Sequence, residues 1–233
     1  MIRNFLFTIF FFIGIIFISI IFLPSLLMPK STVIYGGKLM GHWSSFCLKV
    51  FLSTKITIKG TENINKNQKF FIAASHQSMF ETFFLQTIFN GPIFILKKEL
   101  LLIPIFGWYL KKIGSISIQR NKVTRENLSF FEDILKHTSK SNRPIIIFPQ
   151  ATRVLPNERP PFKKGVARIY EMLKIDCLPI AINSGNVWPK TGEKRPGREI
   201  IISILKSIPH GLIKDDFLNI LEKNIYNELD EIN

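Results

Sequence analysis

The sequence predicts an α/β fold with a mostly parallel central sheet flanked by helices, preceded by an N-terminal membrane helix and an amphipathic interfacial helix. From Lys55 onward, short apolar runs alternate with helical segments, a pattern typical of a sheet covered by helices. Before Lys55, an uncharged apolar stretch runs from Phe5 to Met28. The chain has 233 residues, enough to bury a substantial core. We therefore expect residues 1–54 to anchor the protein in a membrane and residues 55–233 to form the α/β domain.

The apolar stretch is rich in Phe, Ile and Leu, and as a single helix its 24 residues would extend about 36 Å. That length crosses a hydrocarbon core of about 30 Å. A cleaved signal peptide fits less well, because the stretch is long and no small-residue cleavage site follows it. Lysines after the stretch outnumber the positive charges before it, which favours a cytoplasmic main domain. Pro24 and Pro29 leave open a segment that enters one leaflet and turns back.

Apolar residues recur at helical spacing in the next segment, at Leu39, Trp43, Phe46, Cys47 and Val50. After a membrane segment, such a helix fits the membrane interface, with its aromatic rings among the lipids. The same pattern also fits a helix that covers the core of the domain. The sequence leaves both interpretations open.

The elements of the α/β domain are predicted from apolar runs and their periodicity. Candidate strands are Lys55–Lys59, Lys69–Ala74, Pro92–Leu96, Ser115–Ile118, Pro144–Phe148, Cys177–Ile182 and Glu199–Leu205. Candidate helices are Met79–Phe89, Pro104–Lys112, Thr124–Ser139, Gly165–Leu173 and Asp215–Glu231. The acidic last segment is expected to be a closing helix with a solvated face.

The formal net charge of +14 favours acidic partners, such as a membrane surface, nucleic acid or phosphorylated small molecules. Nucleic-acid binding has the least support, because the basic residues are dispersed and no recognised motif is present. The two cysteines, Cys47 and Cys177, lie far apart, and the four histidines have no metal-ligand spacing. We therefore expect neither a disulfide framework nor a metal site.

A histidine and a carboxylate, His76 and Glu81, follow the apolar run that ends at Ala74. Within one continuous helix, residues five apart point about 140° away from each other. The two side chains can therefore meet only if His76 lies in the turn after the strand and Glu81 in the first turn of the next helix. There the carboxylate would orient the imidazole and leave its other nitrogen free as a base. Alternatively, Ser78 to Glu81 spells a capping box, in which Glu81 only caps its own helix.

Arginines follow two other predicted strands. Arg120 comes just after Ser115–Ile118, and Arg153 comes just after Pro144–Phe148, next to Thr152. Functional residues of such sheets collect at the carboxyl ends of the strands, and guanidinium groups bind phosphate well. A surface salt bridge is the alternative for each arginine alone.

Together these segments resemble the glycerolipid acyltransferase family, in particular its bacterial 1-acyl-sn-glycerol-3-phosphate acyltransferases. His76 to Glu81 resembles the HX4D motif, Gly114 to Arg120 the second block, Phe148 to Arg153 the FPEGTR block, and Cys177 to Ala181 the fourth block, an apolar strand with Pro179. The segment from Lys97 to Trp108 also matches the family, and the order and spacing fit from Lys55 to Asn183. The sequence departs from the family at four positions: Glu81 for aspartate, Gln119 for an acidic residue, Gln150 for glutamate and Ala151 for glycine. A positive φ at Ala151 would be strained by its Cβ.

The resemblance implies a 1-acylglycerol-3-phosphate O-acyltransferase of phospholipid biosynthesis. Such an enzyme moves a fatty acyl group from acyl-CoA or acyl carrier protein, without a cofactor, to the sn-2 hydroxyl of lysophosphatidic acid. The resemblance further implies roles for particular residues: His76 and Glu81 are catalytic, Arg120, Thr152, Arg153 and Lys97 bind the acceptor phosphate, and Gln150 and Pro179 support the motifs. The lipid bilayer is the expected partner, nucleic acid is not, and the expected location is the inner membrane with the catalytic domain on the cytoplasmic side.

Two alternatives stay open. The first is an acyltransferase for another lysolipid, such as a lysophospholipid or an amino-acid-linked lipid, because the four blocks do not discriminate between acceptors. The second is a membrane-anchored module that binds lipid phosphates without chemistry. The histidine–carboxylate pair argues against the second alternative.

Overall fold

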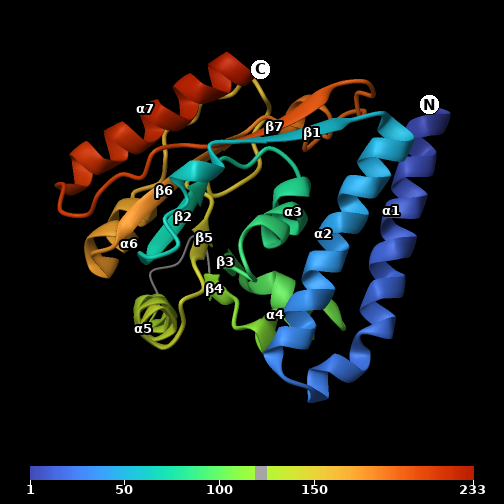
Figure 1. The fold of residues 1–233 in the computed structure, drawn as a ribbon. Coiled ribbons are helices and arrows are strands. Elements are labelled where there is room, and N and C mark those ends of the chain that lie inside the picture. The colour runs from blue at the N-terminus through green and yellow to red at the C-terminus, as the bar shows by residue number, and fades with distance from the viewer. Residues whose placement is uncertain (119–124) are drawn as a thin grey trace.

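A computed structural model describes residues 1–118 and 125–233, and for residues 125–129 it describes only the backbone. Seven strands of the described chain form one sheet in the order β1-β7-β6-β2-β5-β3-β4 (Figure 1). The strands are β1 (Lys55–Lys59), β2 (Phe70–Ala74), β3 (Ile93–Lys97), β4 (Ile116–Ile118), β5 (Ile145–Ile147), β6 (Asp176–Ile182) and β7 (Glu199–Ile204). All neighbouring pairs are parallel except β6 and β7, which are antiparallel. The predicted mostly parallel sheet is confirmed.

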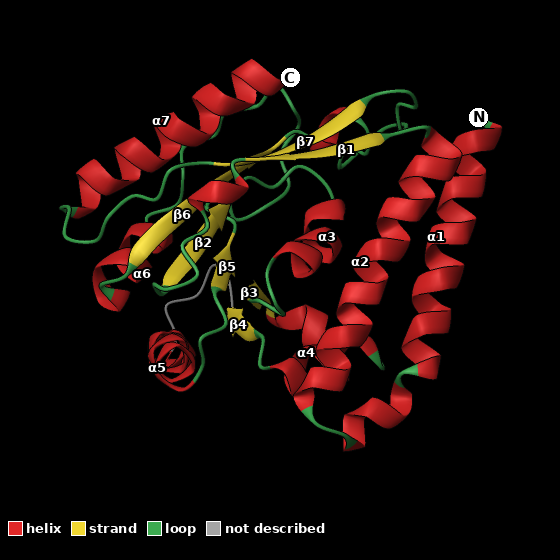
Figure 2. Ribbon diagram, viewed as in Figure 1, coloured by secondary structure: helices red, strands yellow, loops and turns green. Residues whose placement is uncertain are grey.

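Helices cover both faces of the sheet (Figure 2). One face carries α5 (Arg125–Lys140), α6 (Gly165–Leu173) and α7 (Lys214–Ile232). The other carries α3 (Phe80–Ile88), α4 (Phe106–Ile113) and α2 (Lys30–Leu52), with α1 (Ile2–Ile21) outermost. Shorter 3-10 turns are η1 (Leu23–Leu27), η2 (Thr61–Asn63), η3 (Lys98–Leu102) and η4 (Ser184–Asn186).

The N-terminal apolar stretch does not form the single helix predicted over Phe5–Met28. Helix α1 ends at Ile21, and the chain continues through η1 into α2. Pro24 explains the end, because it has no N–H for the next helical hydrogen bond. Helix α1 is nevertheless long and apolar enough to cross a membrane, on length and composition alone. Because α2 runs back along α1, the two helices form a hairpin (Figure 1).

Helix α2 divides the predicted amphipathic stripe between two environments. Cys47 is fully buried in the core, whereas Phe46 and Val50 are about half exposed. Trp43 lies against α1, where its ring nitrogen donates to the carbonyl oxygen of Phe10 over 3.2 Å. One side of α2 therefore covers the domain core, and another side leaves apolar groups uncovered. The placement of α2 in a membrane interface stays a prediction.

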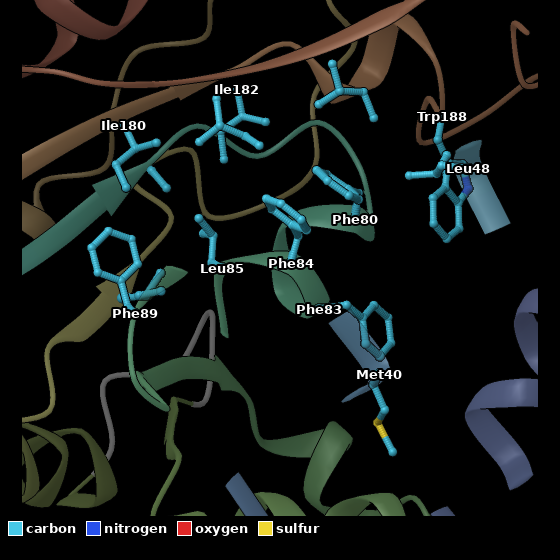
Figure 3. Close-up of a cluster of buried hydrophobic side chains, with 14 of the residues drawn as sticks. Met40, Leu48, Phe80, Phe83, Phe84, Leu85, Phe89, Ile180, Ile182 and Trp188 are labelled. Carbon is cyan, nitrogen blue, oxygen red and sulfur yellow. The ribbon is translucent and has the colours of Figure 1, made fainter. Parts of the chain in front are cut away.

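The hairpin and the sheet share one hydrophobic core. Close approach requires small residues in α2, where the position of a Cβ on Gly41 would lie 2.5 Å from the Phe83 carbonyl oxygen of α3. Figure 3 shows side chains from α2, α3, β6 and the chain after β6 packed together, with labels on Met40, Leu48, Phe80, Phe83, Phe84, Leu85, Phe89, Ile180, Ile182 and Trp188. Phe7 and Phe11 of α1 belong to the same cluster. Residues 1–54 therefore pack as part of the domain in this structure.

Candidate active site

Three loops meet at the carboxyl edge of the sheet. Strand β2 lies between β6 and β5 and runs parallel to both, so these three strands end on the same side. The loop after β2 carries His76, the loop after β5 carries Thr152 and Arg153, and the loop after β6 carries Ser184. The sheet order thus brings together residues that are more than 100 positions apart in the chain.

His76 lies beside the Glu81 carboxylate, as the sequence requires for a pair. Its Nδ1 is 3.8 Å from Glu81 Oε2, within ion-pair range but longer than a hydrogen bond. The Glu81 side chain is fully buried, and the His76 side chain is 15% exposed. The imidazole stacks on the Phe148 ring, with centroids 4.1 Å apart and planes inclined by 18°. The ring therefore has a fixed plane, with Nδ1 toward the carboxylate.

Glu81 also performs the capping role that the sequence allowed as an alternative. Its Oε1 accepts hydrogen bonds from the backbone N–H groups of Gln77 and Ser78, each at 3.0 Å, and Oε2 accepts from Ser78 N–H at 3.1 Å. The Ser184 hydroxyl donates to Oε1 as well. Capping the turn and facing His76 are compatible, because one carboxylate presents two oxygens with several lone pairs.

Gln150, in the loop after β5, contacts the backbone of the histidine turn, which is the segment from His76 to Glu81 that follows β2. Its Oε1 accepts from the His76 N–H over 2.7 Å, and Val154 N–H donates to the His76 carbonyl oxygen over 2.9 Å. Glutamine can fill this role in place of the family's glutamate, since the contact needs only an acceptor oxygen. The next residue, Ala151, has φ +62°, so the expected positive φ is present and is carried by a residue with a Cβ.

Helix α7 contributes a tyrosine behind the loop after β5. The Tyr226 hydroxyl donates to the Pro160 carbonyl oxygen. Burial raises the pKa of Tyr226 to about 12. Tyr226 is therefore neutral at physiological pH and can donate this hydrogen bond.

The residues predicted to bind phosphate lie at the same edge of the sheet, with one outside the described chain. Arg153 is half-buried and makes no ion pair with a described residue, and Thr152 is exposed. Lys97 is exposed at the carboxyl end of β3, on the far side of β5 from β2. Arg120, with its neighbour Gln119, falls outside the described residues. Pro179 lies buried in β6, opposite Ala73 of β2.

Two buried polar residues of this site, Gln77 and Ser184, were not predicted from the sequence. Gln77 Oε1 accepts from the Gly185 N–H over 3.1 Å, while its Nε2 makes no hydrogen bond to a described residue. Ser184 reaches Glu81 across 103 positions of sequence. The only local signal was a run of small polar residues after β6, which is also the signature of an ordinary loop. Among the described residues, no group of three His, Cys, Asp or Glu side chains could hold a metal ion.

The sequence is similar to those of known acyltransferases. A family model described as "Acyltransferase" matches residues 55–183. The chain is 33% identical over 162 residues to a 1-acyl-sn-glycerol-3-phosphate acyltransferase of Pseudomonas aeruginosa, covering 67% of this chain and 62% of that one. It is 31% identical over 182 residues to a protein of the same name from Saccharomyces cerevisiae, covering 76% of this chain and 59% of that one. The chain thus spans about three fifths of the length of these curated relatives.

The fold has a solved counterpart. The crystal structure of the 1-acyl-sn-glycerophosphate (LPA) acyltransferase PlsC from Thermotoga maritima superimposes with a TM-score of 0.79. The match covers 99% of this chain and 97% of that chain, at 21% sequence identity. The arrangement of the hairpin, sheet and helices is therefore that of a known acyltransferase fold.

Proposed function

We infer that this chain, which belongs to the acyltransferase family, transfers a fatty acyl group to the sn-2 hydroxyl of 1-acyl-sn-glycerol 3-phosphate and so forms phosphatidic acid. The observation that carries this proposal is the His76 imidazole beside the buried Glu81 carboxylate, inside the matched region and at the carboxyl edge of the sheet. The names of the relatives supply the acceptor, since each of those cited is called a 1-acyl-sn-glycerol-3-phosphate acyltransferase.

The chemistry follows from the orientation of the imidazole. His76 accepts the proton of the sn-2 hydroxyl while that oxygen attacks the thioester carbonyl carbon of the donor. The C–S bond then breaks, and the proton passes from the imidazolium to the leaving thiolate. Glu81 holds the ring through Nδ1 and stabilises the imidazolium between these two steps. The sequence contains no G-x-S-x-G nucleophile elbow, in agreement with direct transfer without an acyl-enzyme.

The acceptor phosphate is assigned to the cationic residues of the same edge. Arg153 supports this assignment, because a half-buried guanidinium without a described ion-pair partner suits a dianionic ligand. Thr152 supplies a hydroxyl, and Arg120 and Lys97 complete the proposed set. The donor is acyl-CoA or acyl carrier protein, and the transfer needs no cofactor.

The hairpin is proposed to seat the site on the bilayer. Its outer face exposes large apolar side chains, among them Ile13 (58% exposed), Ile16 (57%) and Phe17 (62%). Because α1 packs along α2 and α2 packs on the domain, the arrangement favours the option of a segment that enters one leaflet and turns back. We assign the protein to the inner membrane with its domain on the cytoplasmic side.

A direct assay tests the proposal. The full chain, purified in detergent and returned to vesicles, is supplied with labelled acyl-CoA or acyl carrier protein and with lysophosphatidic acid. We expect labelled phosphatidic acid from at least one donor. Transfer only to a lysophospholipid or an amino-acid-linked lysolipid would contradict the proposed acceptor. Tight binding of lysophosphatidic acid with no transfer from either donor would instead identify a non-catalytic binding module.

A further inference from the structure

We propose that Ser184 is a positioning residue, which fixes the Glu81 carboxylate so that one of its oxygens faces His76. This inference rests on the proposed function. It concerns a residue 103 positions away from Glu81, contributed by a loop on the opposite side of β2 from the loop that carries Arg153.

The buried Glu81 carboxylate needs hydrogen-bond donors. Glu81 has no exposed surface, so an ionised carboxylate there must be satisfied by hydrogen bonds. Its described donors are the N–H groups of Gln77 and Ser78 and the hydroxyl of Ser184. Two of these donors are backbone groups of the turn itself. Ser184 is the only side chain in this set, and it comes from outside the turn.

The two carboxylate oxygens of Glu81 accept different numbers of hydrogen bonds. Oε1 accepts from Gln77 N–H, Ser78 N–H and the Ser184 hydroxyl, whereas Oε2 accepts from Ser78 N–H alone and faces His76 Nδ1. The two backbone donors hold the carboxylate from the side of the turn alone. A third donor, from a separate loop, adds a hydrogen bond to Oε1 only and so favours the orientation in which Oε2 faces the imidazole.

The loop that carries Ser184 is fixed by contacts on both sides of this residue. Asn183, 3% exposed, accepts from Ile201 N–H over 2.7 Å and donates to the Ile232 carbonyl oxygen over 2.6 Å. Gly185 lies so close to Gln77 that an added Cβ would come within 2.9 Å of Gln77 Cβ. The donor therefore approaches Glu81 from a fixed position.

The far end of this loop reaches the N-terminal hairpin. Trp188 N–H donates to the Ser184 carbonyl oxygen over 2.8 Å, and the Trp188 ring packs edge-on against Phe7 and Phe11 of α1 at 5.0 and 4.9 Å. The short segment from Ser184 to Trp188 therefore contacts α1 at one end and carries the Ser184 hydroxyl at the other.

The test compares Ser184→Ala with Ser184→Thr, which keeps a hydroxyl, and with Ser44→Ala. Ser44 is also fully buried, but its hydroxyl has no described partner and lies on α2. We expect Ser184→Ala to lower kcat about tenfold or more at unchanged KM for lysophosphatidic acid, because one hydrogen bond to a charged group is lost. Ser184→Thr should recover much of the loss, and Ser44→Ala should behave as the parent.

The pH profile separates positioning from general damage. Without the Ser184 hydroxyl, the carboxylate is no longer held facing His76 Nδ1, so it stabilises the imidazolium less. The acidic limb of the kcat/KM profile should therefore lie at lower pH in Ser184→Ala than in the parent. A purely structural role would lower kcat equally at all pH values. In parallel, the ring ¹⁵N signals of His76 can be followed against pH in the detergent-solubilised full chain, with His76→Ala for assignment. In Ser184→Ala their midpoint should move to lower pH in the same way, without any turnover.

Three outcomes would overturn the proposal: an unmoved or upward-moved acidic limb, parent-like kcat in Ser184→Ala, or a similar loss in Ser44→Ala. Failure of the proposed function looks different, because then the parent itself makes no phosphatidic acid. The ring signals of His76 would still report whether Ser184 controls the pair. If Ser184→Ala does not fold, Ser184→Cys, which keeps a side chain of similar size but donates only weakly, carries the same comparison of limb position and ring signal.

Discussion

Folded proteins usually bury apolar side chains and expose polar ones, and the histidine turn and the N-terminal hairpin depart from this rule in opposite ways. In the turn, polar residues are inside: Gln77, Ser78 and Glu81 have no exposed surface. In the hairpin, apolar residues are outside, and Phe17 exposes 62% of its surface. A buried polar group or an exposed apolar patch is the informative deviation in a folded protein, since exposed polar and buried apolar residues are expected everywhere.

The two regions also differ in how they are built. The Glu81 carboxylate accepts hydrogen bonds from the turn itself and from the loop after β6. The apolar outer face of the hairpin belongs to one local segment, and we propose that lipid covers it. Substitutions should therefore act through geometry and turnover in the turn, and through partitioning and stability in the hairpin.

The largest expected effect is at the turn. His76→Ala should lower turnover by about 10²–10⁴-fold, the usual worth of general-base catalysis, without unfolding the protein. The imidazole is 15% exposed and its Nδ1 makes no described hydrogen bond, so its loss removes little that holds the fold. The measurement is phosphatidic acid formation at saturating substrates, with thermal unfolding as the control. Normal turnover in the purified variant would remove His76 from the mechanism.

The next effect is at the hairpin. Replacement of Ile13 and Phe17 together by Asn removes two side chains from the outer face of α1, where each is more than half exposed. Complete burial of such a side chain is worth about 1.5–3 kcal/mol. Because Ile13 is 58% and Phe17 62% exposed, partitioning onto vesicles should fall by about 2–4 kcal/mol in free energy. Turnover with detergent-dispersed substrate should change little. Vesicle sedimentation measures the partition.

A matched pair on the opposite side of the sheet provides the control. Leu135 of α5 and Ile220 of α7 are 45% and 39% exposed, and their joint replacement by Asn leaves the hairpin intact. This variant should bind vesicles as the parent does. An equal loss in both double variants would mean that lipid contact is not confined to the hairpin.

A third and smaller effect concerns the acceptor. Arg153→Ala should raise KM for lysophosphatidic acid about tenfold, as expected for the loss of a charged hydrogen bond, with kcat less affected. Arg159→Ala is the control, because that arginine already pairs with Asp230 at 2.6 Å and lies over the Tyr226 ring. If KM stays constant in Arg153→Ala, the arginine has a structural role instead.

Most elements of the fold could be predicted, because each depends on a pattern within a short stretch of sequence. Predicted strands end within one residue of the observed ones, because each buried parallel strand is a short apolar run bounded by polar residues. The N-terminal helix was predicted too long, because its apolar composition continues past Pro24 although its hydrogen bonds do not. The early start of α2, at Lys30, was missed because Gly36, Gly37 and Gly41 resemble breaks in a helix.

The site was predictable only where the chain itself brings residues together. His76 and Glu81 lie in one turn, so their spacing could be argued from helix geometry. Ser184 and Gln150 reach that turn from other strands, and the order β6-β2-β5 that places them there is not written in any local pattern. Long-range polar contacts of this kind depend on topology, which sequence periodicity does not specify.

The last expected effect is on stability alone and concerns the contact between the two regions, where α2 of the hairpin crosses α3 of the turn. A Cβ on Gly41 would lie 2.5 Å from the Phe83 carbonyl oxygen, which is backbone and cannot move aside alone. A Cβ on Gly37 would approach only Gln86 Oε1, the far end of a flexible side chain. Gly41→Ala should therefore lower the free energy of unfolding by about 1–3 kcal/mol through overpacking, whereas Gly37→Ala should leave it unchanged or raise it by up to about 1 kcal/mol through helix propensity. Both changes carry the same helix propensity, so their difference, measured by denaturant unfolding in detergent, isolates the contact; equal effects would mean that α2 and α3 can separate without cost.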